Sequence, residues 1–319
     1  MDARDNAAVD WLLASAEPAV RMLTRRDVLG EPSDGDVLEG AWVRALLSGQ
    51  QSDGGFGVHW YRKWTGAHWR LVQLIELGVP AGELRALAAL DSVLDRLTGP
   101  RQVTVIDGLA RVCASIEGNA LAVACRLGDT GDPRVRRLVE WLLEWQWPDG
   151  GWNCDKQATG RRSSFHETLP TAWGLQEYAA ATGDPDAAEA ARRAAELFLE
   201  HRLFRSLQTG EVVDPKWLRL CYPPYWHYDV LQVLLVLSRM GLAGDPRADD
   251  ALDHLESRRH ADGRWRANQQ WWKPGGGPIT PEVVDWGRAG EPNLMITLNA
   301  MRVRKAAGRL HAEAVATDG

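Results

Sequence analysis

The stretch Gln146-Trp147-Pro148-Asp149-Gly150-Gly151-Trp152 contains the motif on which the fold prediction depends. The same pattern, Gln-x-x-Asp-Gly-Gly-aromatic, recurs at Gln50-Gln51-Ser52-Asp53-Gly54-Gly55-Phe56. A degenerate copy occurs at Arg259-His260-Ala261-Asp262-Gly263-Arg264-Trp265. Because a motif that returns along one chain indicates repeated structural units, the sequence predicts a repeat architecture.

A second repeated signal is a glycine followed two residues later by a proline. It returns at intervals of about 50 residues, at 30–32, 78–80, 131–133, 183–185 and 244–246. Glycine favours the end of a helix, whereas Asp and Pro favour the start of the next one. Each triplet therefore predicts a short turn between two helices, and the period predicts helical hairpins.

The triplets divide the predicted helices into two sets. Outer helices that follow the triplets are expected at about 36–49, 81–97, 133–146, 185–203 and 246–260. Inner helices that precede them are expected at about 17–28, 66–77, 117–127, 166–181 and 226–240, with further helices at about 5–14 and 292–306. The preceding set is more apolar all round, which is typical of helices surrounded by protein.

The predicted connections from outer to inner helices are long. They run at about 50–65, 98–116, 147–165, 204–225 and 261–291. Long loops in a compact domain are usually functional, and in an alternating arrangement they should meet at one end of the fold. We call this end the mouth.

The Gln-x-x-Asp-Gly-Gly-Trp turns resemble the repeats of terpene (squalene-type) cyclases and of protein prenyltransferase β subunits. The resemblance covers about residues 36–306, and two repeats match closely. It implies an all-α fold, an α/α toroid with six inner and six outer helices in helical-hairpin repeats. We expect a single α/α-barrel domain over residues 1–319, with its core at about 5–306 and a disordered tail at about 308–319.

Composition narrows the functional classes. A net charge of −6 and a pI near 5.8 argue against a nucleic-acid-binding surface. The four cysteines are scattered without a C-x-x-C motif, which favours a reducing cytoplasm. The chain begins without a signal peptide, and no apolar run reaches the ~20 residues of a membrane span. A cytoplasmic protein without stable membrane insertion is expected, and nothing predicts its oligomeric state.

Residues suited to acid–base chemistry occur near the starts of the predicted inner helices. The catalytic candidates are His68, Glu117, His166, Glu167, His227 and Asp229. A carboxyl group in a poorly hydrated aromatic cavity has a raised pKa, which suits a general acid or base, with a nearby histidine as its partner. The alternative is that the carboxylates only cap helices.

Zinc is the one cofactor that these residues suggest. In the prenyltransferases that the sequence resembles, zinc is held by an Asp, a Cys and a His near the starts of inner helices. Cys154, His166 and His227 offer comparable ligands, although the Asp-x-Cys order of that family is absent. The alternative is a hydrogen-bonded network of His and carboxylate groups without a metal.

The expected substrate is small and apolar, with or without an anionic head group. Aromatic rings can stabilise a developing cation, and basic residues together with helix N-termini attract anions. Tryptophans in long loops can instead serve as local cores. The substrate-binding candidates are Trp60, Trp64, Trp69, Arg70, Arg162, Tyr228, Trp272 and Asp285.

These features favour a terpene-cyclase/prenyltransferase-like enzyme. It would act on an isoprenoid or another apolar substrate in the barrel mouth, by His/carboxylate acid–base or zinc-assisted chemistry. Standard squalene cyclisation is not expected, because the Asp-x-Asp-Asp acid motif is absent. Two alternatives remain, namely an α/α-toroid lyase acting on a polar or saccharide substrate and a non-catalytic binding module.

Overall fold

The computed structural model describes residues 1–33, 35–271 and 283–310. Within them the fold is all-α apart from one two-stranded antiparallel sheet, β1 (Thr104–Ile106) with β2 (Leu109–Arg111). The α-helices are α1 (Ala3–Leu13), α2 (Pro18–Leu23), α3 (Ala41–Leu47), α4 (Ala67–Glu76), α5 (Leu84–Leu97), α6 (Ala114–Leu127), α7 (Pro133–Glu144), α8 (Phe165–Thr182), α9 (Pro185–Glu200), α10 (Val230–Arg239), α11 (Asp249–Ser257) and α12 (Leu294–Ala306).

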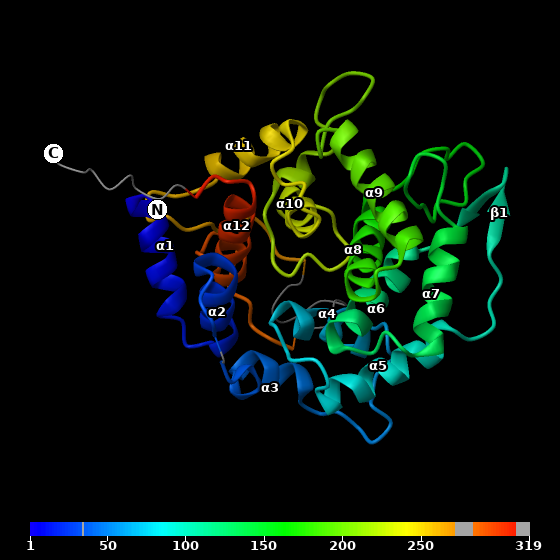
Figure 1. The fold of residues 1–319 in the computed structure, drawn as a ribbon, viewed down its shortest axis with the longest axis horizontal. Helices are drawn as coiled ribbons and strands as arrows, with labels where there is room; N and C mark the ends of the chain where they lie inside the picture. Colours follow the sequence, from blue (N-terminus) through cyan, green and yellow to red (C-terminus); the bar gives the residue numbers. More distant parts are fainter. Residues whose placement is uncertain (34, 272–282, 311–319) are drawn as a thin grey trace.

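The helices form an inner and an outer group. Figure 1 shows α1, α3, α5, α7, α9 and α11 at the periphery and the even-numbered helices nearer the centre. Helices α4, α6, α8, α10 and α12 pack against one another in that order, and α2 packs on α12. The division into inner and outer helices therefore follows the alternation that the sequence predicts.

Each predicted helix has an observed counterpart, most of them with ends shifted by a few residues. One difference is that the helix expected at 17–28 is α-helical only to Leu23 and continues as a π-helical segment, Thr24–Leu29. A second is the β-hairpin, which lies inside the loop expected at 98–116. Most of the tail expected at 308–319 lies outside the described residues.

Three of the five proline triplets lie directly at helix starts. The side chains of Asp132, Asp184 and Asp245 accept backbone hydrogen bonds at helix starts, and each is followed by proline. The glycine that ends the preceding helix is not always the one in the triplet. Helix α6 ends at Gly128, with φ 80°, rather than at Gly131. The turn is therefore longer than the triplet at this repeat.

The glutamine of the repeat motif links its own turn to the next outer helix. Gln50 Nε2 donates to the carbonyl oxygen of Gly54 at 3.1 Å and to that of Arg85 in α5 at 2.7 Å. Gln146 makes the equivalent pair of bonds in the second copy, including one to Ala190 O in α9 at 2.8 Å. The glutamine therefore fixes the next outer helix against the turn to which the glutamine itself belongs.

The aromatic residue of the motif joins an outer helix to the following inner helix. Trp152 Nε1 donates to Leu142 O of α7 at 3.0 Å, and its backbone N–H donates to Thr168 Oγ1 of α8 at 3.1 Å. Trp265 makes the same two kinds of bond, to α11 and to α12. The motif therefore clamps an outer helix to the following inner helix, and the glutamine extends this clamp to a third helix.

The degenerate copy keeps the geometry with a different residue. Arg259 replaces the glutamine, and its Nε donates to Gly263 O at 3.3 Å. Its guanidinium also donates to Asp5 Oδ1 of α1 at 2.7 Å, with both side chains buried. The clamp of this copy therefore holds the N-terminal helix, which is the outer helix next to α11 in Figure 1.

Helices α6 and α8 approach each other more closely than side chains would allow. A Cβ added to Gly174 would lie 2.2 Å from Gly118 O, and one added to Gly118 would lie 2.5 Å from Thr171 Cα. Only glycine fits at such a contact. The two helices that carry several of the candidate site residues are therefore held at a fixed backbone distance.

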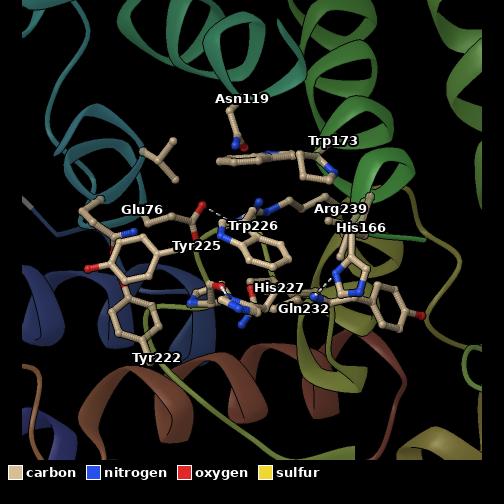
Figure 2. Close-up of a pocket in the computed structure, with 18 residues that line it drawn as sticks. Glu76, Asn119, His166, Trp173, Tyr222, Tyr225, Trp226, His227, Gln232 and Arg239 are labelled. Carbon is tan, nitrogen blue, oxygen red and sulfur yellow. Dashed lines mark hydrogen bonds and ion pairs between the residues drawn. The ribbon is translucent and has the colours of Figure 1, made fainter. Parts of the chain in front are cut away.

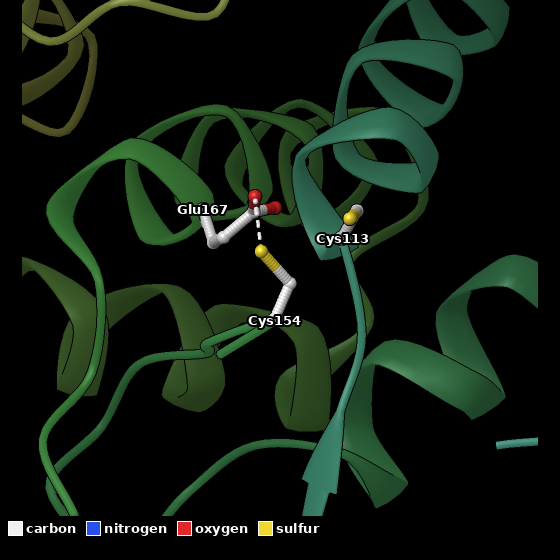
Figure 3. Close-up of side chains that lie close together, drawn as sticks. All are labelled: Cys113, Cys154 and Glu167. Carbon is white, nitrogen blue, oxygen red and sulfur yellow. Dashed lines mark hydrogen bonds between the residues drawn. The ribbon is translucent and has the colours of Figure 1, made fainter. Parts of the chain in front are cut away.

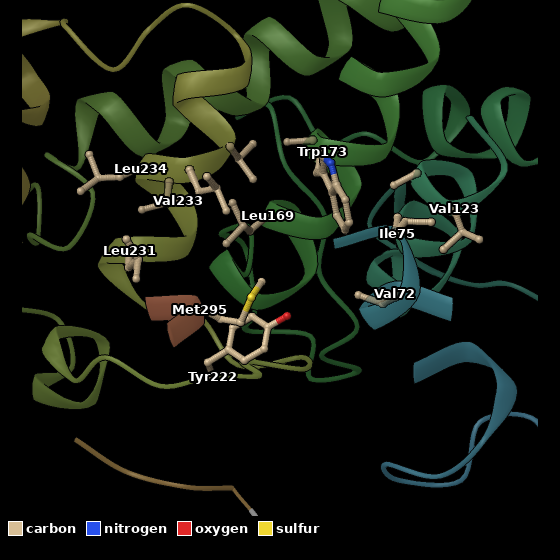
Figure 4. Close-up of a cluster of buried hydrophobic side chains, with 14 of the residues drawn as sticks. Val72, Ile75, Val123, Leu169, Trp173, Tyr222, Leu231, Val233, Leu234 and Met295 are labelled. Atoms are coloured by element: carbon tan, nitrogen blue, oxygen red, sulfur yellow. The ribbon is translucent and has the colours of Figure 1, made fainter. Parts of the chain in front are cut away.

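The hydrophobic core extends through both groups of helices. Figure 4 shows part of it, with Val72 and Ile75 of α4, Leu169 and Trp173 of α8 and Leu231 of α10 directed into the interior. In the part of the chain that the structure describes, no helix is both long and apolar enough to cross a membrane.

We predict that Gly54→Ala destabilises the protein much more than Gly49→Ala. Both glycines have positive φ, 78° and 71°, so each alanine incurs the cost of that conformation, ~1 kcal/mol. At Gly54 the new Cβ would also lie 2.0 Å from Ala88 O, whereas nothing lies within 4 Å at Gly49. The clash should add about 2 kcal/mol or more, measured by urea unfolding. Equal losses would show that this contact does not hold α5.

Candidate functional site

A cavity lies between the inner helices, beneath the loop that precedes α10. The cavity volume is about 60 Å³, and the space around it is partly open to solvent. Helices α4, α6, α8 and α10 contribute to its walls, which are mainly aromatic and aliphatic (Figure 2). The lining side chains that bear on ligand binding are Val72, Gln73, Glu76, Asn119, His166, Trp173, Tyr225, Trp226, His227, Tyr228, Gln232 and Arg239.

His166 lines this cavity from the first turn of α8. Its Nδ1 accepts a hydrogen bond from the backbone N–H of Tyr228 at 2.9 Å, so the proton of the neutral ring is on Nε2. Burial lowers the pKa of His166 below its ordinary value. The hydrogen bond from Tyr228 occupies the lone pair of the neutral ring, so His166 is not placed to accept a proton from a ligand.

His227 has the opposite arrangement of donor and acceptor. Its Nδ1 lies 3.1 Å from Pro224 O and donates to it, which leaves Nε2 with a free lone pair. Burial lowers the pKa of His227 to about 4, and the ring is neutral near pH 7. Trp226 stacks on this ring at 3.9 Å, and Trp271 at 3.3 Å, between ring centroids. His227 is therefore a neutral, rigidly held imidazole at the cavity wall.

The cavity also has polar groups with unused hydrogen-bonding capacity. Gln73 Oε1 and Gln232 Nε2 are buried, and neither has a hydrogen-bond partner among the described residues. Gln73 is on α4 and Gln232 is on α10. An unpaired buried polar atom is costly, so these amides are suited to bind a polar atom of a ligand or a water molecule.

A charged pair closes the deep end of the cavity. Arg239 of α10 and Glu76 of α4 form an ion pair at 2.7 Å, and the guanidinium lies 4.9 Å from the centroid of the Trp173 ring. Burial alone would raise the pKa of Glu76, but the nearby Arg239, Arg302 and Arg126 lower it. Glu76 therefore remains ionised and is not a proton donor near neutral pH.

The predicted carboxylates lie away from the histidines. Glu167 follows His166 on α8, but successive residues of a helix point about 100° apart. Its Oε2 accepts from the backbone N–H of Ser115 at 3.0 Å, and its Oε1 lies 3.4 Å from Cys154 Sγ. The buried carboxylate of Glu117 forms an ion pair with Arg101, which is exposed. Neither residue lines the cavity.

Asp229 caps α10. Its Oδ1 accepts the backbone N–H of Gln232 at 3.0 Å, and its other oxygen lies 3.4 Å from Cys221 Sγ. Burial raises the pKa of Asp229 to about 7. The residue does not border the cavity, so the expected His227–Asp229 pair is not formed, and the helix-cap alternative describes its contacts.

His68 lies one layer behind the cavity wall. It is buried, and burial lowers its pKa to about 3. Its Nε2 lies 3.5 Å from Nδ2 of Asn119, which does line the cavity. Its ring packs against Trp60 and Trp69. His68 can orient Asn119, but it does not border the space that a ligand would occupy.

The candidate tryptophans of the first mouth loop and of the start of α4 support the cavity wall from behind. Trp64 stacks on Tyr225, a lining residue, with ring centroids 3.8 Å apart. Trp69 packs edge-on against both of these rings. Trp60 lies beside Tyr61 and His68. Tyr228 lines the cavity directly.

The other substrate-binding candidates have structural contacts or are exposed. Arg70 donates to the carbonyl oxygens of Thr65, Leu46 and Ser48, and this fixes the end of α3. Arg162 is exposed. Asp285 is also exposed and accepts the backbone N–H of Gly287 at 3.0 Å in a turn. Trp272 lies outside the described residues.

The structure does not bring the predicted zinc ligands together. Cys154 forms a group with Cys113 and Glu167, whose ligand atoms all lie within 4.8 Å of one another. Among the residues that the structure describes, no comparable group includes His166 or His227. The reason is that Cys154 faces α6, whereas both histidines face the cavity on the other side of α8.

Sequence reasoning missed the lining residues that lie deeper in the helices, namely Gln73, Trp173, Gln232 and Arg239. All four lie deeper in the helices than the long loops and helix starts, where the predicted site residues are found. A signal was available, because Gln232 interrupts the apolar run of α10. A polar residue inside a helix that is apolar all round usually has a specific partner or a function.

No family model and no curated protein matches the sequence. Among solved structures, the chain is similar to the type II terpene cyclase MstE from Scytonema in its apo form, with 15% identity and a TM-score of 0.32, over 85% of this chain and 97% of that chain. A variant of that enzyme in complex with merosterolic acid A, its product, gives the same identity and TM-score over 96% of that chain. At this TM-score the similarity supports no assignment of fold or activity.

We predict that Asp229→Asn changes the pH dependence of stability. The folded-state pKa of Asp229 is about 7, above the ordinary value of 3.8. The protonated carboxyl therefore contributes its full stability below pH 3.8, and this contribution is lost as the pH rises from 3.8 through 7. Asn cannot ionise and is also a good N-cap. The free energy of unfolding of Asp229→Asn, relative to that of wild type, should therefore rise by roughly 2–4 kcal/mol between pH 4 and 7.5, as measured by urea unfolding.

Asp132→Asn is the matched control for this prediction. Asp132 caps α7 at the surface, and its hydrogen bond to Arg134 lowers its pKa. Wild type should therefore gain stability relative to this variant as pH rises through the acidic range. Identical pH profiles for wild type and Asp229→Asn would contradict a raised pKa of Asp229.

Proposed function

We propose that the chain is an α/α-toroid enzyme that binds an apolar, isoprenoid-like substrate in the cavity between α4, α6, α8 and α10. The observation that carries this proposal is the aromatic and aliphatic lining of the cavity, with the neutral imidazole of His227 held at its wall. Aliphatic side chains such as Val72 and Leu169 suit a hydrocarbon better than a saccharide, whose hydroxyl groups need many polar partners.

His227 has the geometry of a general base. Its Nε2 can accept a proton from the substrate, and the rings on either side hold the imidazole in place during that transfer. The faces of Trp226, Tyr225 and Trp173 can stabilise positive charge that develops on the hydrocarbon. This version of the acid–base prediction uses His227 without a carboxylate partner.

An anionic head group would be bound at the outer edge of the cavity. Lys63 Nζ lies 5.2 Å from the centroid of the Trp226 ring, and both Lys63 and Lys216 contribute to the lowered pKa of His227. Two cations therefore lie near the point at which the hydrocarbon would enter. A diphosphate or carboxylate there would leave the apolar tail to fill the cavity.

A second candidate function is binding without catalysis. It is favoured by the contacts of His166 and Glu167, because the expected pair of histidine and carboxylate does not form. The unpaired amides of Gln73 and Gln232 would then select a ligand by hydrogen bonding alone. The two functions share the cavity, and turnover distinguishes them.

We predict that Val72→Phe weakens ligand binding, because the larger side chain fills part of the cavity. The probes are farnesol and farnesyl diphosphate, titrated against tryptophan fluorescence. Affinity should fall by about tenfold or more. Val213→Phe, at a residue whose side chain is 48% exposed, is the control and should bind as wild type does. Equal affinities of the two variants would exclude this cavity as the site.

We predict that His227→Gln lowers turnover of an isoprenoid diphosphate by about 100-fold, because the base is lost while the cavity is kept. Products are measured by gas chromatography and mass spectrometry after incubation with farnesyl and geranylgeranyl diphosphates. The control is His260→Gln, at an exposed residue of a repeat turn. Since the pKa of His227 is about 4, wild-type kcat/KM should be flat between pH 5.5 and 8. Tight binding without any product would favour the binding function.

A further inference from the structure

Three metal-ligating side chains meet beside the cavity without contributing to it. Cys113 precedes α6, Cys154 lies just after the Gln146–Trp152 turn, and Glu167 is in the first turn of α8. Their sulfur and oxygen atoms all lie within 4.8 Å of one another, and Figure 3 shows the three side chains converging. None of them lines the cavity, so a site formed by this group would be independent of the proposed function.

Backbone pairing brings the two cysteines together. Arg111 forms a parallel bridge with Asn153, and the N–H of Val112 donates to Asn153 O at 3.1 Å. Cys113 and Cys154 directly follow these paired residues. The β-hairpin that sequence reasoning missed therefore guides Cys113 to Cys154. The position of the thiol pair is set by hydrogen bonds of the chain and not by the thiols themselves.

The carboxylate is also held in place. Glu167 Oε2 accepts the N–H of Ser115 at 3.0 Å, which leaves Oε1 3.4 Å from Cys154 Sγ. The close contact of Gly118 with Gly174 fixes the distance between the helices that carry these groups. The three ligands are therefore positioned before any ion binds, which reduces the ordering cost of binding.

The electrostatics of the group favour a cation. A hydrogen bond from Cys154 lowers the pKa of Cys113, whereas the same interaction together with burial raises the pKa of Cys154. Burial raises the pKa of the nearby Tyr61 hydroxyl, and the negative charge of Glu167 raises it further. A divalent cation bound between these three groups would displace the thiol protons and be stabilised by two thiolates and a carboxylate.

We propose that Cys113, Cys154 and Glu167 bind one zinc ion, with a fourth position left for water or a ligand. Thiolate sulfur selects zinc over magnesium or calcium, and a carboxylate is a common third ligand. Ligand atoms around tetrahedral zinc lie roughly 3.5–3.8 Å apart, so the group needs only a small contraction. Cys113 is exposed, and solvent can therefore reach the fourth position.

The test measures metal content and cobalt spectra of the full-length protein. After purification under reducing conditions without chelators, mass spectrometry with inductively coupled plasma should find about one zinc per chain. Exchange for Co²⁺ should give a thiolate-to-cobalt charge-transfer band in the near ultraviolet. Cys113→Ser, Cys154→Ser and Glu167→Gln should each weaken zinc binding at least ~10-fold in competition with a chromophoric chelator.

Matched controls separate ligation from folding. Cys125→Ser changes a cysteine at the other end of α6 and should bind zinc as wild type does. Cys154→His supplies a different zinc ligand, so it should keep the metal while the charge-transfer band weakens. Circular dichroism and thermal unfolding check that each variant is folded. If one serine variant unfolds, Cys154→His and Glu167→Gln still decide the question.

Three results would overturn the proposal. The first is wild-type protein that contains no zinc and takes up neither zinc nor cobalt when fully reduced. The second is folded Cys113→Ser and Cys154→Ser variants that bind zinc as wild type does. The third is a cobalt complex without a thiolate band. A disulfide between Cys113 and Cys154 that forms in air, with no metal uptake after reduction, belongs to the first outcome.

Discussion

The contact between the turn glycine of each of the three motif copies and the backbone of the next outer helix is the constraint on which the other features depend. Gly54 faces α5, Gly150 faces α9 and Gly263 faces α1, each where a Cβ would overlap a carbonyl oxygen. Side chains elsewhere can adjust by rotation, but two backbones in contact cannot. These contacts therefore set the spacing of the outer helices, and the aromatic residue that follows each turn transmits that spacing to an inner helix.

The candidate site inherits this geometry. Trp152 fixes α8, and α8 then directs two neighbouring side chains to different places, His166 to the cavity and Glu167 to the cysteines. A rotation of α8 by a fraction of a turn would move His166 out of the cavity wall and Glu167 away from the cysteines. The close packing of Gly118 and Gly174 excludes such a rotation. One helix thus borders an apolar cavity on one face and the group of Cys113, Cys154 and Glu167 on the other.

The sequence predicts the helices well because period and caps are local properties. Asp184 and Pro185 start a helix whatever surrounds them. The partners of a side chain are not local, since they depend on the rotation of each helix and on the path of its loop. His166 and Glu167 are adjacent in sequence, which suggests a pair, but the helix separates them. Cys113 could not be assigned to Cys154 without the bridge between Arg111 and Asn153.

The replacement of glutamine by Arg259 in the last repeat has a consequence for cooperativity. Linear repeat proteins have two terminal repeats with one neighbour each, and they can fray from either end. Here the last turn grips the first helix, through a buried ion pair with Asp5 and the contact of Gly263 with Arg4. The first and last repeats are therefore neighbours of each other. Opening the structure at this junction breaks contacts of the first and of the last repeat. The domain is therefore expected to unfold as one unit and not by stepwise unfolding of repeats from one end.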